Sequence, residues 1–250
     1  MNHDAAMDQP QQVAPSPSQL VDEAKAAAPS RDAADVAKSA EREKWRASLR
    51  EANRHVWLHG PQESGDSLDA SLKRNSAFIK RLKQTNLADA KDALVKEVQL
   101  LSLTKYLDEL IPSIPEILWK ATQLKDRYAA IEILSALHAR FGGSEFTEPL
   151  VKVIEQEIVP PPPKSQDASN EQAQKEAAQV ARQRSLLRGV TEMVLVGLVG
   201  PVTQSEGVCA PGLNWLHEQL RKMLSQDRDL VYTSVAQAIL RSVSYTHLRA

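Results

Sequence analysis

Apolar positions between residues 68 and 83 repeat with the period of an α-helix. At about 100° per residue, Leu68, Leu72, Ile79 and Leu82 fall within one narrow arc, and Phe78 flanks it. The opposite half of the wheel is basic and carries Lys73, Arg74, Lys80 and Arg81, with Lys83 at its margin. The segment therefore predicts a helix that buries one face and offers five cations to solvent or to a partner, with Asp66 or Ser67 as its N-cap.

The same periodicity predicts helices over residues 87–101, 104–120, 123–141 and 147–158. Asn86 is a candidate cap for the first of these. We expect a kink or a break in the second, near Pro112 and Pro115, because proline removes a helix hydrogen bond. Gly142 and Gly143 should end the third.

Four consecutive prolines begin at Pro160, and a polar tract follows them, so residues 160–178 are expected to be a linker, either a loop or a frayed helix start. Helical periodicity returns in residues 180–200, 213–226 and 230–242. Helix follows helix with no strand signal. The fold class we predict is all-α, a HEAT-like stack of antiparallel helix pairs.

Composition and periodicity divide the chain into four segments. Residues 1–39 have almost no large apolar side chains and should be disordered. Residues 40–60 are charged and should form an exposed leading helix that Gly60 and Pro61 end. Residues 66–243 should form the helical domain. Residues 244–250 neither continue the periodicity nor cap it, so we expect a non-native tail on an N-terminal fragment whose domain is incomplete.

Composition narrows the function classes. The net charge is −1, which argues against a protein that binds nucleic acid through an overall positive charge. Aromatic residues make up 4% of the chain, which argues against rows of aromatic side chains that stack on bases. Cys209 is the single cysteine, so a reducing compartment is expected. The longest apolar run, residues 193–199, is too short to cross a bilayer, and no signal sequence is visible, so we interpret the chain as soluble and intracellular.

Candidate chemistry is sparse. Residues 60–67 have the glycine spacing of a phosphate-binding loop, but Asp66 stands where lysine should be and would repel phosphate. His55 and His59 have metal-ligand spacing without further ligands, and a solvated pair is the better interpretation. His138 lies on an apolar helix without a neighbouring nucleophile, which favours a hydrogen-bonded core histidine. We predict no enzyme activity, catalytic residue, cofactor or metal.

Two features are candidate contacts. The basic face Lys73, Arg74, Lys80, Arg81 and Lys83 could bind RNA phosphates or an acidic partner, and the alternative is a solvated helix face. Trp57 has little apolar company on its charged helix, which suggests a partly exposed contact. The alternative is that it packs back onto the domain.

Five blocks in order, residues 68–83, 101–116, 131–141, 187–200 and 212–229, resemble the first middle domain, similar to that of initiation factor 4 gamma, in the regulator of nonsense transcripts 2 family. The resemblance covers roughly residues 40–242. It implies an all-helical, HEAT-like domain inside a large cytoplasmic scaffold, with a perinuclear location also considered. That scaffold links the mRNA decay helicase to an exon-junction-linked factor, through regions that this sequence does not contain.

The resemblance implies a non-catalytic scaffold or adaptor segment in nonsense-mediated mRNA decay. Its expected partners are other decay factors, with RNA as a further candidate and no membrane. The alternative is a general translation or cap-complex adaptor whose middle domain binds a helicase and RNA. An enzyme with an unrecognised site ranks last.

Overall fold

The computed structural model describes residues 31–62, 68–84, 86–160, 169–200, 210–227, 230–233, 235–237 and 239–240. The chain forms two compact units, residues 1–44 and residues 45–250. The described part of the first unit is the beginning of helix α2. The second unit begins at Trp45.

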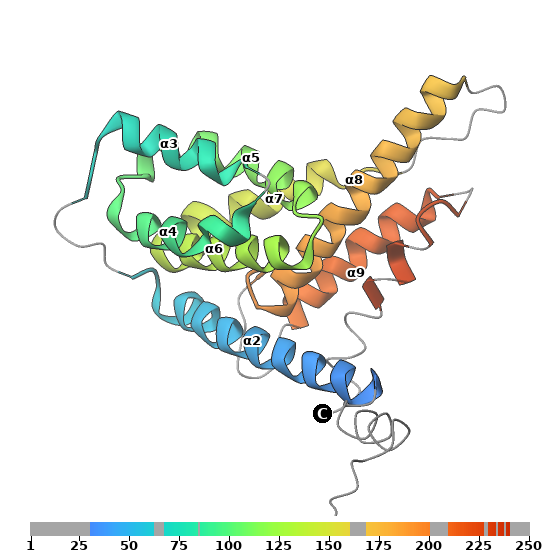
Figure 1. The fold of residues 1–250 in the computed structure, drawn as a ribbon, viewed down its shortest axis with the longest axis horizontal. Helices are drawn as coiled ribbons and strands as arrows, with labels where there is room; N and C mark the ends of the chain where they lie inside the picture. The colour runs from blue at the N-terminus through green and yellow to red at the C-terminus, as the bar shows by residue number, and fades with distance from the viewer. Residues whose placement is uncertain are drawn as a thin grey trace, which may run out of the picture. The chain divides into compact units, whose positions relative to one another are not determined.

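Within the described residues the fold is all-α, which confirms the predicted class. Its helices in chain order (Figure 1) are α2 (Arg31–His59), α3 (Leu72–Leu82), α4 (Leu87–Leu100), α5 (Leu107–Lys120), α6 (Leu124–Gly142), α7 (Glu148–Glu157), α8 (Asn170–Leu195) and α9 (Ala210–Ser225). A short 3-10 turn, η1 (Thr104–Tyr106), precedes α5, and a π-helical turn, η2 (Gly143–Thr147), precedes α7. Among these residues the one β-type contact is an isolated bridge between Asp69 and Leu101.

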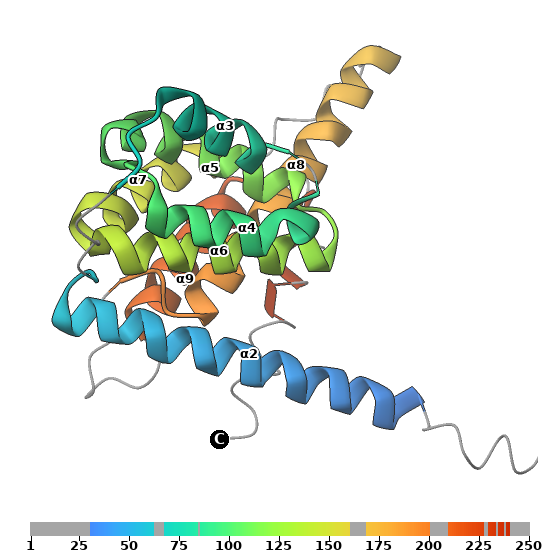
Figure 2. The same cartoon turned by 60° about the vertical axis from the view of Figure 1, so that its left-hand side comes forward.

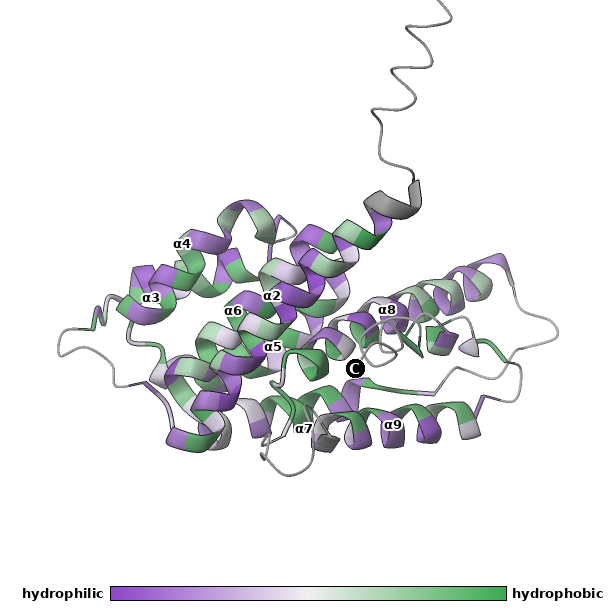
Figure 3. Ribbon diagram, turned by 90° about the horizontal axis from the view of Figure 1, so that it is seen from below, coloured by the Kyte–Doolittle hydropathy of each residue, from purple (hydrophilic) through white to green (hydrophobic). Residues whose placement is uncertain are grey.

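Neighbouring helices pack in pairs. Helix α4 lies against both α3 and α6, α5 lies against α7 and α8, and α8 lies against α9. Figure 2 shows α3, α4 and α6 following one another side by side. Hydrophobic and hydrophilic residues alternate around each helix rather than forming separate stretches (Figure 3), so each helix can bury one side and solvate the other.

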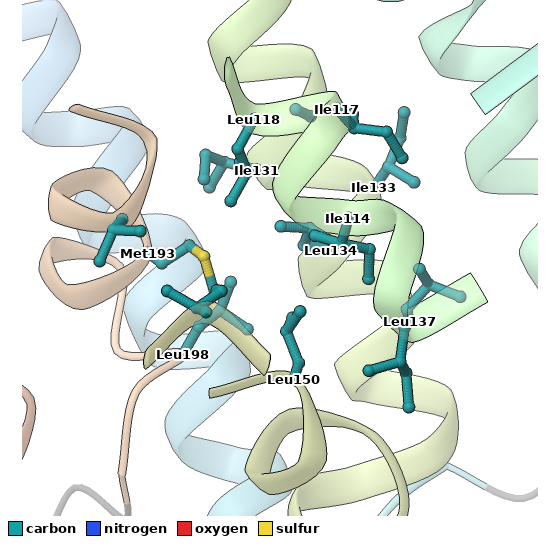
Figure 4. Packing of buried hydrophobic residues seen from close by; sticks show 14 of the residues in the cluster. Ile114, Ile117, Leu118, Ile131, Ile133, Leu134, Leu137, Leu150, Met193 and Leu198 are labelled. Carbon is teal, nitrogen blue, oxygen red and sulfur yellow. The ribbon is translucent and has the colours of Figure 1, made fainter. Parts of the chain in front are cut away.

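The core is aliphatic. Leu118 of α5, Ile131 of α6, Leu150 of α7 and Met193 of α8 converge in it (Figure 4), and all four side chains are buried. Burying a side chain of this size stabilises a fold by about 1.5–3 kcal/mol. The apolar residues that repeat with helical periodicity in the sequence are therefore the ones that form this core.

Helix α3 begins one turn later than predicted. Its first residue, Leu72, is 69% exposed, and Asn75 takes a buried position beside Phe78. The Asn75 side-chain amide donates to the carbonyls of Asp69 and Ser71, at 3.2 and 2.9 Å, which makes its burial tolerable. The prediction that Leu72 is buried was therefore wrong. The predicted caps Asp66 and Ser67 lie outside the described residues.

The cap of α4 also differs from the prediction. Asn86 makes no side-chain capping bond, and the backbone N–H of Ala88 instead donates to the carboxylate of Asp126 in α6, at 3.0 Å. A tertiary contact thus satisfies a helix-end donor that the local sequence assigned to Asn86.

Helix α5 runs without a break through Pro112 and Pro115, contrary to the predicted interruption. The two internal prolines cost about 6 kcal/mol at about 3 kcal/mol each, and burial of Leu110, Ile114 and Leu118 at about 1.5–3 kcal/mol each is of the same size. The buried face of this helix can therefore offset the lost backbone bonds.

The end of α6 is as predicted. Gly142 has a φ of +75°, in the left-handed region that favours glycine, and it ends the helix. The ring of Pro61 lies 3.2 Å from where a β-carbon of residue 142 would stand, so a larger side chain would meet both strain and a contact.

Polar segments are more helical than predicted. Residues 31–39 belong to α2, and residues 170–178 of the expected linker belong to α8, whose N-cap Ser169 accepts a bond from the N–H of Gln172 at 3.3 Å. The expectations for residues 1–30, Cys209 and residues 244–250 fall outside the described residues. No helix in the described ranges has the length and apolar character needed to span a bilayer.

Candidate interaction surface

Helix α3 carries the predicted basic face, and its inner side fixes which residues point outward. Phe78, Ile79 and Leu82 are buried against the core, so Lys73, Arg74 and Lys80 are exposed on the other side. Arg81 and Lys83 are half-buried at the edges of the helix. The structure therefore brings the five predicted cations onto one helix but does not expose them equally.

Three of these cations already have acidic partners. Arg74 pairs with Asp69, Arg81 pairs with Glu97 of α4, and the ammonium of Lys83 lies 3.8 Å from the carboxylate of Glu109 in α5. These pairs hold the ends and sides of α3 against its neighbours. Their charges are partly neutralised, which weakens them as sites for an external anion.

Lys73 and Lys80 differ from the other three. Both are exposed, and neither has a hydrogen bond or ion pair with any described residue. They lie seven positions apart, or two helical turns, on the outer side of α3. The prediction that the basic face contacts RNA or a partner stays a prediction, and these two lysines are the residues best placed for it.

Trp57 is partly buried and has internal partners. Its indole N–H donates to the carbonyl of Gly197 at 3.1 Å, and its ring lies 4.9 Å from the ring of His138. A β-carbon on Gly143 would stand 2.1 Å from Cζ3 of the same indole. These contacts agree with the alternative that Trp57 packs back onto the domain, and a partner contact at Trp57 stays a prediction.

The sequence analysis missed a row of polar side chains on α2 that we call the α2 seam: Arg46, Arg50, Asn53 and Trp57. Arg50 donates to the carbonyl of Leu195 at 3.0 Å, and the Asn53 amide donates to that of Val196 at 2.8 Å. Trp57 adds its bond to Gly197. The seam satisfies the carbonyls that end α8, and its arginines suit the negative end of that helix dipole.

Arg46 completes the seam with a buried ion pair. Its guanidinium binds both carboxylate oxygens of Glu192, at 2.7 and 2.8 Å, and the side chains are 3% and 8% exposed. The predicted exposed leading helix is thus corrected from Trp45 onward, because one face of α2 is buried. The i, i+4, i+7, i+11 spacing of the seam was the available signal, but arginine and asparagine ordinarily indicate solvent.

His138 is the core histidine that the sequence predicted. Its ring nitrogens lie 2.7 Å from the hydroxyl of Thr147 and 3.4 Å from the carbonyl of Asn53. Desolvation by burial lowers the pKa of His138 from 6.5 to about 4. The imidazole is therefore neutral at physiological pH and links α6 to α2.

The remaining histidines of interest stay on the surface. His55 and His59 are exposed, with ring centroids 4.5 Å apart. Within the described residues, no group of three or more His, Cys, Asp or Glu side chains is arranged to hold a metal ion.

The chain is similar to known proteins both in sequence and in fold. No family model matches the chain. Regulator of nonsense transcripts 2 from Mus musculus is 31% identical over 190 residues, which is 76% of this chain and 13% of that protein. Nonsense-mediated mRNA decay protein 2 from Saccharomyces cerevisiae is 39% identical over 132 residues, which is 52% of this chain and 12% of that protein.

A solved structure gives the deciding observation. The N-terminal mIF4G domain of Saccharomyces cerevisiae Upf2 matches with a TM-score of 0.62 and 28% identity, over 81% of this chain and 66% of that one. The chain is a homologue of one segment of regulator of nonsense transcripts 2. That solved protein is described as involved in the degradation of mRNAs containing premature stop codons. The matched segments span only 12–13% of the two full-length relatives named above.

Proposed function

We propose that the chain acts in nonsense-mediated mRNA decay as a non-catalytic scaffold segment. The observation that carries this proposal is the combined match in sequence and fold to the N-terminal mIF4G domain of a decay factor. The structural role of the buried ionisable groups also supports this proposal. Arg46, Glu192 and His138 all connect one helix to another, which suits a rigid platform.

The partners we propose are other decay factors, with the decay helicase and the exon-junction-linked factor bound through the rest of the protein. On this segment we propose Lys73 and Lys80 as direct contacts, because they are the exposed cations of α3 without a partner among the described residues. We also propose that the protein works in the cytoplasm, where translating mRNAs are inspected.

A domain replacement tests the role. The matched segment of Saccharomyces cerevisiae decay protein 2 is exchanged for that of this chain, and the half-life of a reporter mRNA with a premature stop codon is measured. We expect rapid decay of this reporter to be restored, while a reporter with a normal stop codon keeps its half-life. A chimera that accumulates normally but leaves the premature-stop reporter stable would overturn the proposal.

Matched variants sharpen this test. Replacing Arg46 by glutamate puts two negative charges together in a buried place and should abolish both accumulation and decay. The same change at Arg54, which is paired with Glu51 at the surface of the same helix, should leave both intact. Co-purification with the initiation helicase instead of decay factors would favour the general translation adaptor.

A further inference from the structure

Two exposed leucines lie at one end of the α3–α4 pair. Leu72 is 69% exposed and Leu100 is 54% exposed. Leu72 is the first residue of α3, and Leu100 is the last residue of α4. The backbone N–H of Asp69 donates to the carbonyl of Leu100 at 2.9 Å, which holds the start of α3 beside the end of α4. The two helices lie side by side (Figure 2), so both leucines belong to the same end of the pair.

Two lysines flank these leucines. Lys73 follows Leu72 directly, and Lys96 precedes Leu100 by one turn on the same side of α4. Both are exposed and have no hydrogen bond or ion pair with a described residue. We call Leu72, Lys73, Lys96 and Leu100 the leucine–lysine patch.

The acidic groups near the patch already face other cations, and the Asp92 carboxylate, one turn before Lys96, lies 3.5 Å from the ammonium of Lys91. Asp69 pairs with Arg74 and also accepts the N–H of Ser71 at 2.8 Å, and Glu97 pairs with Arg81. The lysines of the patch therefore keep their positive charge available for an outside partner. The two leucines offer apolar contact area, and the lysines beside them add positive charge to the same end of the helix pair.

We propose that the leucine–lysine patch binds an acidic peptide segment of a partner protein, which places leucine-type anchors on Leu72 and Leu100 and carboxylates beside Lys73 and Lys96. This rests on the proposed scaffold function and names the chemistry of one partner. The apolar half of the patch favours protein over RNA, because leucines offer neither stacking nor charge to nucleotides. A second copy of the chain is disfavoured because its lysines would meet these lysines.

A binding assay tests the proposal with the full chain. The probes are fluorescently labelled helical peptides, each about 15 residues long and rich in glutamate. Each peptide carries two leucines, and the second leucine follows the first by three, four or seven positions. We expect at least one to bind with a Kd below about 1 mM and to weaken as salt rises. The same peptide with serines in place of its leucines should lose at least about tenfold in affinity, which equals about 1.4 kcal/mol.

Variants of the patch give the specific readout. L72S/L100S and K73E/K96E should each weaken the peptide by about tenfold or more. The matched control is L124S/K125E, an exposed leucine and lysine at the start of α6, beside the opposite end of α4. It should leave the affinity within about twofold. Circular dichroism confirms that all variants keep their helices.

The outcomes separate the alternatives. The proposal is overturned if no peptide binds, if L72S/L100S binds as the wild type does, or if L124S/K125E is weakened equally. It is also overturned if labelled poly(U) RNA competes for the patch and depends on the lysines alone. If the wild-type chain binds no peptide but restores reporter decay in the chimera, this inference fails and the proposed scaffold function stands. If the wild-type chain binds the peptide but does not restore reporter decay, the proposed function fails and the patch remains a peptide-binding site.

Discussion

At the scale of single residues, two buried polar groups of this chain, Asn53 and His138, connect helices that are far apart in the sequence. Asn53 reaches Val196 and Ser135, and the His138 ring lies between Thr147 and the carbonyl of Asn53. A buried polar group costs free energy unless it is paired, so these contacts fix how the helices meet. Two predictions follow from single side chains.

The first prediction concerns the pH dependence of stability. His138 titrates near pH 4 in the folded chain and near 6.5 when unfolded. Above pH 6.5 neither state is protonated, and below it only the unfolded state gains a proton until about pH 4 is reached. His138 alone should therefore remove about 3 kcal/mol of unfolding free energy between these values.

The test replaces His138 by glutamine and measures urea unfolding between pH 7 and pH 4. The stability difference between wild type and variant should shrink as the pH falls, because only the wild type carries this penalty. His55→Gln, at an exposed position, is the control and should run parallel to the wild type. Equal slopes for His138→Gln and the wild type would contradict the assignment.

The second prediction concerns Trp57 and Gly143. Gly143 has an ordinary helical φ of −70°, so alanine is acceptable to its backbone, but the new β-carbon would stand 2.1 Å from the indole. Gly143→Ala should therefore destabilise the chain by about 1–3 kcal/mol through overpacking. The measurement is the free energy of unfolding in urea.

A double-variant cycle shows whether the indole is the cause. In a Trp57→Leu background the bulky ring is gone, and Gly143→Ala should then cost much less. Additive effects of the two substitutions would mean that Trp57 does not fill the space over Gly143, and its role as a partner contact would regain support.

At the scale of elements, α2 is held by polar contacts as well as by apolar burial. The α2 seam reaches the last turn of α8, and Trp45 donates to Glu132 of α6 at 2.9 Å. Sequence periodicity could not show which carbonyls the polar residues of α2 would meet. Those acceptors lie about 140 positions away along the chain.

The third prediction compares two arginine pairs on α2. Arg46–Glu192 is buried, whereas Arg54–Glu51 has the same two-bond geometry with exposed side chains. Arg46→Met should cost about 3–5 kcal/mol because it leaves the carboxylate of Glu192 buried without its charge partner. Arg54→Met should have a far smaller effect.

The combined change Arg46→Met with Glu192→Leu should recover most of that loss, because an apolar pair can replace a buried ion pair. Urea unfolding of the three variants provides the comparison. Equal destabilisation by Arg46→Met and Arg54→Met would show that the buried pair does not hold α2 onto α8.

At the scale of the whole molecule, the local sequence pattern predicted the helices and their order. Tertiary contacts decided where helices continue through prolines and which polar side chains pair with one another. The apolar period placed α4, α6 and α7 within one or two residues of their ends. It failed where burial overrode local rules, as at Pro112 and Pro115 in α5, and it left open whether residues 170–178 form a loop or the start of a helix. It found Lys73 and Lys80 but not that Arg81 has a partner on α4, because an ion pair across helices leaves no trace in one segment.

One hydrophobic cluster joins the helices of the second unit. Leu49 of α2, Phe78 of α3, Leu216 of α9 and Ile239 pack against or within it. A single cluster leaves no natural division at which part of this unit could unfold alone, so we expect cooperative unfolding. The four tryptophans can test this because each reports on a different junction.

The fourth prediction is that urea unfolding of the chain gives coincident transitions by far-ultraviolet circular dichroism and by tryptophan emission. Trp45 faces Glu132 of α6, Trp119 of α5 lies 3.4 Å from the guanidinium of Arg182 in α8, and Trp215 of α9 donates to Glu155 of α7 at 2.6 Å. Trp45→Phe and Trp215→Phe, which remove opposite reporters, should each keep the two transitions together. An emission change that precedes the loss of helix in only one variant would show that the corresponding junction opens independently, and the single-cluster account would then fail.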